Sequence, residues 1–162
     1  MHARSIPDLP AQHEGLRRRI REAQVSPEIQ AAALQRLDRL PEGTALCHGD
    51  FHPANVVLTA HGPRILDWPT AMCGNPLGDV ARTSLILRLL EPSPEMSITW
   101  ALRLVRDIFH ATYLKRYLQL RSVSREAIEA WLLPVAVART LEGLPYEREN
   151  LPRLIQALMK DA

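Results

Sequence analysis

The sequence predicts a mainly α fold with a small β-hairpin component, which is an α+β domain. Two observations carry this prediction. Most apolar residues recur at helical spacing between breaks rich in Pro and Gly, whereas residues 55–67 read as two short strands joined by a turn. With 162 residues, 46% of them hydrophobic, the chain is long enough to bury a core. We therefore expect residues 1–162 to form a single domain.

Two helices are expected before the hairpin. Residues 10–23 form an amphipathic segment with Arg on its outer face. A second helix begins at Ser26 and Pro27, because Ser is a favoured N-cap and Pro suits the first helical position. Residues 41–43, Pro-Glu-Gly, end it. Its expected buried stripe consists of Ile29, Ala33, Leu37 and Leu40.

The hairpin is predicted from a change of pattern in the middle of the chain. Residues 55–59 favour a strand, residues 60–63 a turn, and residues 64–67 the returning strand. An antiparallel return of this length would bring Asp67 back beside Asn55.

Helices are expected over most of the remaining chain. They cover residues 79–90, residues 96–120, a segment capped by Ser124 and kinked at Pro134, and residues 150–160. The long helix over residues 96–120 carries an apolar stripe that we expect to be core: Ile98, Leu102, Val105, Phe109, Tyr113 and Tyr117.

Three polar side chains stand in an order that suits phosphoryl transfer from a nucleotide. This reaction needs a carboxylate near the acceptor hydroxyl and hard oxygen ligands for Mg²⁺. Asp50 and Asn55 lie five residues apart in the pattern H-x-D-x-x-x-x-N, and Asp67 follows at the end of the hairpin. The three side chains can therefore point into one cleft.

The segments that hold these residues resemble the aminoglycoside phosphotransferase and choline kinase-like family, which has a protein kinase-like fold. The matching segments are residues 46–57, 65–68 and 74–81, in that order. The resemblance covers the family's C-terminal large lobe. It implies an enzyme that uses Mg²⁺ and ATP, or GTP, to phosphorylate a hydroxyl of a small molecule. Because the sequence shows neither a long apolar stretch nor a signal-peptide pattern, we expect a cytoplasmic protein.

The same resemblance implies roles for individual residues. Asp50 would be the catalytic base, and His48 would brace the catalytic loop. Asn55 and Asp67 would bind the nucleotide through Mg²⁺. Taken alone, Asp50 also fits a loop cap, since His-Gly-Asp is a common sequence.

Four further positions around the motifs have expected roles. Asp79 would be a buried carboxylate that bonds backbone groups of the catalytic loop, and Trp68 a hydrophobic anchor under it, unless it touches nucleotide. His52 either bonds backbone or meets substrate. The family often has Gly where this chain has Ala54, which matters only if the position needs a positive φ.

The small N-terminal lobe of such kinases has no counterpart in this sequence. That lobe carries a flexible phosphate-binding loop and a strand Lys paired with a Glu. Only Gly15 and Gly43 precede Gly49, and the first Lys is Lys115. We therefore expect a large lobe alone, truncated or encoded apart from its small lobe, in which residues 1–4 resemble the end of the helix that links the lobes.

Composition argues against several other functions. A net charge of +2 without a run of basic residues does not favour a nucleic-acid partner, and no apolar stretch reaches the ~18 residues of a membrane span. Zinc bound by Cys47, His48, His52 and Cys73 is disfavoured, because neighbours in a strand face opposite sides. We expect both cysteines to be buried apolar residues.

Two alternatives to an active kinase remain open. The chain could be a catalytically inactive remnant that keeps the fold and binds a partner or ligand, which an exposed apolar face would favour. In either case, a separate N-terminal lobe or a second copy of the chain is a possible partner at the exposed lobe face. A metal-dependent phosphoesterase would need more ligands than His61 and His110 supply downstream. Basic residues outnumber acidic ones beyond residue 81, which favours a small hydroxylated acceptor, such as a sugar or an amino alcohol, over a polycation.

Overall fold

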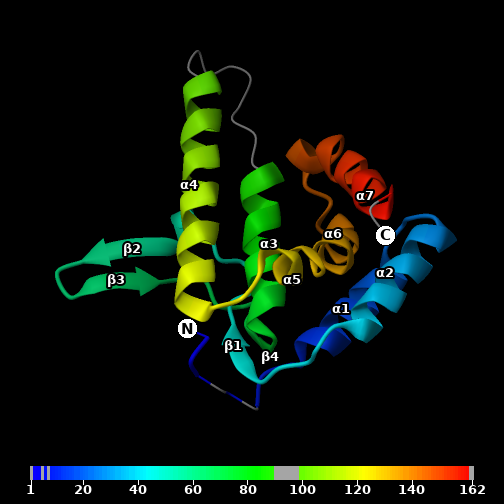
Figure 1. The fold of residues 1–162 in the computed structure, drawn as a ribbon, viewed down its shortest axis with the longest axis horizontal. Helices are drawn as coiled ribbons and strands as arrows, with labels where there is room; N and C mark the ends of the chain where they lie inside the picture. The colour runs from blue at the N-terminus through cyan, green and yellow to red at the C-terminus, as the bar shows by residue number, and fades with distance from the viewer. Residues whose placement is uncertain (1, 5, 7, 90–98, 161–162) are drawn as a thin grey trace.

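The computed structural model describes residues 2–4, 6, 8–89 and 99–160, which are mostly helical with two small antiparallel sheets (Figure 1). The helices are α1 (Gln12–Glu22), α2 (Pro27–Arg39), α3 (Pro76–Leu89), α4 (Thr99–Arg121), α5 (Arg125–Glu129), α6 (Leu132–Arg139) and α7 (Asn150–Lys160). The strands are β1 (Ala45–Cys47), β2 (Val56–Thr59), β3 (Gly62–Ile65) and β4 (Met72–Gly74). Short 3-10 turns lie at Pro53–Asn55, Thr140–Glu142 and Pro145–Glu147.

The core is organised around α6. Every residue of this helix is buried, and it packs against α1, α2, α3 and α7. Pro134 was expected to kink one continuous helix, but the helix instead breaks before Trp131 into α5 and α6. Pro134 then lies in the first turn of α6, where a missing N–H costs no intrahelical hydrogen bond.

Helix starts follow local capping rules where a cap exists. Ser26 accepts a hydrogen bond from the Ile29 amide at 3.4 Å, with Pro27 in the first turn, as predicted. The next helix, α3, begins at Pro76, three residues earlier than predicted, so Asp79 lies in its first turn. The predicted boundaries at Leu90 and Met96 lie outside the described residues.

The predicted hairpin is present but shifted. Strands β2 and β3 pair from Val56 opposite Ile65 to Thr59 opposite Gly62, so the turn contains only residues 60–61. The shorter turn closes because Gly62 adopts a φ of 93° and the Thr59 hydroxyl donates to its carbonyl at 2.8 Å. Asp67 consequently lies beyond the strand instead of within it.

A second sheet, β1 paired with β4, was not individually predicted. Ala45 lies opposite Gly74, and Cys47 lies opposite Met72. This pairing joins the strand before residues 48–50 to the segment that follows Asp67. The two sheets and α3 thus bring the three sequence motifs to one side of the helical core (Figure 1).

The expected core stripe of α4 is correct only in its C-terminal half. Tyr113 and Tyr117 pack against the core, but Val105 is 63% exposed and Phe109 is 42% exposed. Ile98 lies outside the described residues. The helix runs beside α3 (Figure 1), and helical spacing predicted an apolar face without revealing how far its neighbours extend. In the N-terminal half of α4, Trp100, Leu104 and Ile108 are also exposed.

Within the part of the chain that the structure describes, none of the helices combines the length and the apolar character required to cross a membrane.

Candidate active site

The loop after β1 is fixed by a glycine that no other residue can replace without strain. Gly49 has a φ of 78°, and a Cβ built on it would lie 2.4 Å from the carbonyl oxygen of Thr70. The Thr70 hydroxyl also donates to the carbonyl of His48 at 2.9 Å. The loop therefore packs directly against the segment that follows Asp67.

Asp79 lies beneath this loop. Its side chain is buried and accepts hydrogen bonds from the amides of His48 at 3.0 Å and Gly49 at 2.7 Å. Burial alone would raise the pKa of Asp79, but hydrogen bonds from His2 and from these two amides outweigh it, so the pKa lies below its usual value. A charged Asp79 thus ties α3 to the loop.

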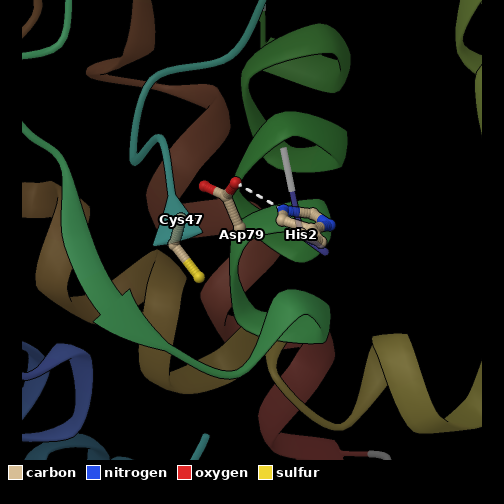
Figure 2. Close-up of side chains that lie close together, drawn as sticks. All are labelled: His2, Cys47 and Asp79. Carbon is tan, nitrogen blue, oxygen red and sulfur yellow. Dashed lines mark hydrogen bonds and ion pairs between the residues drawn. The ribbon is translucent and has the colours of Figure 1, made fainter. Parts of the chain in front are cut away.

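Asp79 also contacts the N-terminal segment, as Figure 2 shows. Nε2 of His2 lies 3.0 Å from Oδ2 of Asp79, and its Nδ1 lies 3.1 Å from the Tyr117 hydroxyl. Residues 2–3 form a turn, and Met1, the first residue of the segment expected to end the interlobe helix, lies outside the described residues. In the same segment, the Arg4 carbonyl accepts a hydrogen bond from the Leu46 amide at 2.7 Å.

Cys47 completes a cluster with His2 and Asp79 in which one ligand atom from each lies within 4.8 Å of the others. Both oxygens of Asp79 already accept hydrogen bonds, and burial raises the pKa of the Cys47 thiol to about 12. Cys47 is fully buried as expected, whereas Cys73 is only half-buried. Among the described residues, the zinc set considered from the sequence does not assemble.

His48 is buried at the centre of the loop. Its Nε2 lies 2.8 Å from the Leu66 carbonyl, and its Nδ1 accepts from the Asp50 amide at 3.2 Å. The Trp68 ring lies 4.6 Å from the imidazole, and its Nε1 donates to the Ile65 carbonyl at 2.9 Å. Trp68 is nevertheless 36% exposed, so one side of the ring faces solvent.

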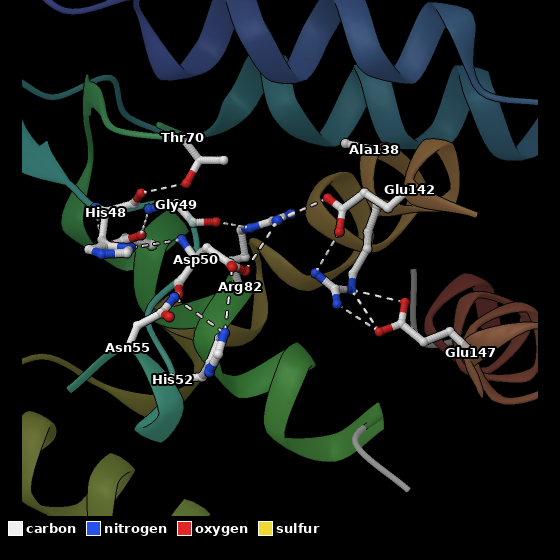
Figure 3. A network of polar contacts seen from close by, with 12 residues as sticks. His48, Gly49, Asp50, His52, Asn55, Thr70, Arg82, Ala138, Glu142 and Glu147 are labelled. Carbon is white, nitrogen blue, oxygen red and sulfur yellow. Dashed lines mark hydrogen bonds and ion pairs between the residues drawn. The ribbon is translucent and has the colours of Figure 1, made fainter. Parts of the chain in front are cut away.

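The side chain of Asn55 meets the backbone of Asp50 at the end of the loop (Figure 3). Asn55 Nδ2 donates to the Asp50 carbonyl at 2.9 Å and lies 3.3 Å from His52 Nε2. The Asp50 carboxylate is 30% exposed, with His52 Nε2 at 3.5 Å. Ala54 lies in the 3-10 turn and is not among the described residues with positive φ, so the missing Gly has no backbone cost.

Asp67 lies next to this pair and adopts an unusual backbone conformation. The amide of Leu66 donates to the Asn55 carbonyl at 2.9 Å, which places Asp67 directly after the contact. Asp67 is exposed and has a φ of 62°, which is uncommon outside Gly although Asp tolerates it. Within the described parts of the chain, no hydrogen bond or ion pair engages its carboxylate.

Sequence reasoning missed a network of arginines behind Asp50 (Figure 3). Nη2 of Arg82 lies 3.7 Å from Asp50 Oδ1 and 2.9 Å from Glu142 Oε1, and its Nε donates to the Gly49 carbonyl. Glu142 also pairs with Arg19 at 2.8 Å and with Arg139 at 2.9 Å. The only sequence signal was the excess of Arg, which does not indicate partners more than 100 residues apart.

The network borders a cavity of about 280 Å³ between α1, α3, α6 and the segment before β4. Gly49, Thr70 and Arg82 line it on the loop side, and Arg18 and Arg19 line it on the α1 side. His52, His61 and His110 contribute nothing to its lining. His110 instead lies 2.6 Å from the Ser84 hydroxyl, and burial lowers its pKa to about 4.

Residues 1–131 match the model of the phosphotransferase enzyme family, a range that contains the loop, the hairpin and α3. No curated protein matches the chain.

Proposed function

This chain belongs to the phosphotransferase enzyme family, and on that premise we propose that it transfers the γ-phosphoryl group of ATP or GTP to a hydroxyl of a small molecule. One observation carries the proposal. Asp50, Asn55 and Asp67 gather where the catalytic loop meets the hairpin, and the other side of that loop is held by Asp79. A fixed loop with oxygen-bearing side chains at its open end suits a reaction that depends on positioning.

The residues present fit a Mg²⁺ site. Mg²⁺ prefers oxygen ligands and is held by one or two protein groups together with nucleotide phosphates. The nitrogen of Asn55 is committed to the Asp50 carbonyl, which leaves its Oδ1 for a ligand. The Asp67 carboxylate is exposed, and its left-handed backbone conformation is the kind of local strain that occurs at ligand sites.

The proposed division of labour follows from these contacts. The metal, when bound, would neutralise charge on the transferred phosphoryl group. Asn55 and Asp67 would hold it, and Asp50 would accept a hydrogen bond from the acceptor hydroxyl and take its proton as the new bond forms. His48 would keep Asp50 in place through the amide of that residue.

A calorimetric titration of Mg-ATP into the purified chain tests this proposal, with Asp67→Asn as the matched control. Asn also tolerates a positive φ, so the variant removes charge while preserving the backbone. We expect binding tighter than about 1 mM, or −4.1 kcal/mol, in the wild type and none in the variant. Equal binding by both proteins would overturn the assignment of Asp67.

A second candidate function is favoured by exposed apolar side chains near the site. Leu58 on β2 is 84% exposed, Leu66 after β3 is 47% exposed, and Trp68 is 36% exposed. Apolar groups gathered beside a functional loop mark interaction surfaces. In this alternative the chain is an inactive module that binds a separate N-terminal lobe or a second copy of itself. Sedimentation that stays monomeric at high concentration, together with Mg-ATP binding by the isolated chain, would argue against it.

A further inference from the structure

The cavity behind the catalytic loop has a cationic lining. Arg18, Arg19 and Arg82 contribute three guanidinium groups to its wall. The one carboxylate in the lining, Asp79, is buried and already accepts hydrogen bonds from His2 and from two loop amides. The wall therefore presents an excess of positive charge to a ligand.

The carboxylates near the cavity are shared among several arginines. Glu142 is the shared partner of Arg19, Arg82 and Arg139, and Arg139 is further paired with Glu147 at 2.7 Å. Burial lowers the pKa of Arg19; Glu142 opposes this shift, whereas the neighbouring arginines add to it. Arg19 and Arg82, the two arginines of this group that line the cavity, therefore share Glu142 as their close carboxylate, and Arg82 faces Asp50 at the longer distance of 3.7 Å. Two guanidinium groups that share one close carboxylate favour an additional anion, because Arg binds oxyanions through paired N–H donors.

The cavity also lies beside the proposed catalytic base. Gly49 precedes Asp50 in the chain and lines the cavity, and the guanidinium of Arg82 reaches from the cavity wall to within 3.7 Å of Asp50. A ligand held by Arg19 and Arg82 can thus place another part of itself at Asp50. A volume of about 280 Å³ is close to the lower end of ligand pockets, which suits a small metabolite.

We propose that the acceptor is a small hydroxylated molecule that carries an oxyanion, and that Arg19 and Arg82 bind this oxyanion in the cavity while its hydroxyl faces Asp50. This assignment rests on the proposed phosphotransferase function. It names the chemical class of the acceptor, a hydroxy acid or a hydroxylated phosphate monoester. It also explains why a polycation is disfavoured, since a cationic ligand would meet the three arginines directly.

Four probes of matched size and different charge test the proposal. Glycerol 3-phosphate and glycerate carry oxyanions, glycerol is neutral, and 3-amino-1,2-propanediol is cationic. Each is titrated calorimetrically into the chain alone and into the chain saturated with Mg-ATP. We expect binding of the two anions only, with little change when Mg-ATP is present, and phosphorylation of at least one of them when turnover is measured.

Variants on α1 locate the binding. Arg19→Gln should weaken anion binding roughly tenfold, the order expected for losing a charge-assisted hydrogen bond, and Arg19→Lys should restore part of it. Arg21→Gln is the matched control, because Arg21 is exposed on the same helix and does not line the cavity. Circular dichroism of each variant checks that the fold is kept.

The outcomes separate this assignment from the proposed function. Preferential binding of glycerol or the amine, or equal effects of the Arg19 and Arg21 substitutions, would overturn the oxyanion site while leaving Mg-ATP binding intact. Competition between the anions and Mg-ATP would assign the arginines to nucleotide phosphates and overturn the acceptor class. Anion binding without any Mg-ATP binding would overturn the phosphotransferase function, and with it the acceptor assignment.

Discussion

The two ends of the catalytic loop differ sharply in their surroundings. At the anchored end, His48 and Asp79 are buried, and their polar groups are matched by backbone partners. At the open end, the Asp50 carboxylate is 30% exposed and Asp67 has no partner among the described residues. Under the proposed function, one end stabilises the fold and the other is left free for chemistry, so substitutions at each end should affect different quantities.

The largest expected effect is on the anchored end, at Gly49. Gly49→Ala would force a left-handed conformation on Ala and a Cβ contact of 2.4 Å with the Thr70 backbone. We expect a loss of about 3–5 kcal/mol in the free energy of unfolding, measured by urea denaturation, from strain together with overpacking.

Gly62→Ala is the control for this substitution. Gly62 has a φ of 93°, but no atom lies within 4 Å of an added Cβ. It therefore isolates backbone strain, which costs about 1–3 kcal/mol. If both variants lost the same stability, the close packing of Gly49 against Thr70 would carry no energetic weight.

The next effect is at Asp79. Asp79→Ala would leave the buried amides of His48 and Gly49 unpaired, which we expect to cost ~1–3 kcal/mol. Asp38→Ala serves as a control, because Asp38 forms an exposed ion pair with Arg17 and such pairs contribute about 0–1 kcal/mol. A stable Asp79 variant would contradict its anchoring role.

The pKa of Asp79 predicts how the stability of the protein depends on pH. Because the pKa of Asp79 is lower in the folded protein, its contribution is present above the unfolded pKa of about 3.9 and is lost as pH falls through the folded value. Wild-type stability should therefore decline more steeply than that of Asp79→Asn in the acid range. Parallel pH profiles from thermal denaturation would show that no stabilising carboxylate is being protonated.

This comparison also separates what the sequence could reveal from what it could not. The hairpin and the loop that holds Asp50 and Asn55 could be predicted because spacing and local pairing limit the geometry of residues close in sequence. The role expected for Asp79 came from the family resemblance. The Arg19–Glu142 pair joins residues 123 positions apart, and no local pattern indicates such a partner. Excess Arg on α1 looked like an ordinary solvated face.

The fourth long helix shows a different limit. Periodicity predicted an apolar face on α4, and the face exists from Trp100 to Tyr117. Periodicity cannot say whether a neighbour covers it, since that depends on the length and position of α3. Val105 and Phe109 are consequently exposed although their spacing is that of core residues.

A smaller effect is expected at Asn55, which joins the two ends. Asn55→Asp keeps a ligand oxygen but loses the Nδ2 donor to the Asp50 carbonyl. We expect a loss of about 1 kcal/mol in unfolding free energy while Mg-ATP binding persists. Asn55→Ala should lose both. Loss of nucleotide binding in the Asp variant as well as in the Ala variant would mean that the ligand oxygen is not sufficient and that nucleotide binding requires the hydrogen bond.

The smallest expected change in stability is at the open end. Among the described residues, no hydrogen bond or ion pair engages the Asp67 carboxylate, and Asn adopts a φ near 62° as readily as Asp. We therefore expect Asp67→Asn to change the unfolding free energy by no more than about 0.5 kcal/mol. Asp67→Gly should be equally stable or slightly more so, because Gly adopts this φ without strain. Both variants should nevertheless lose Mg-ATP binding. Unfolding of Asp67→Asn under native conditions would instead show that Asp67 supports the fold, and the proposed division of this site into an anchored end and an open end would fail.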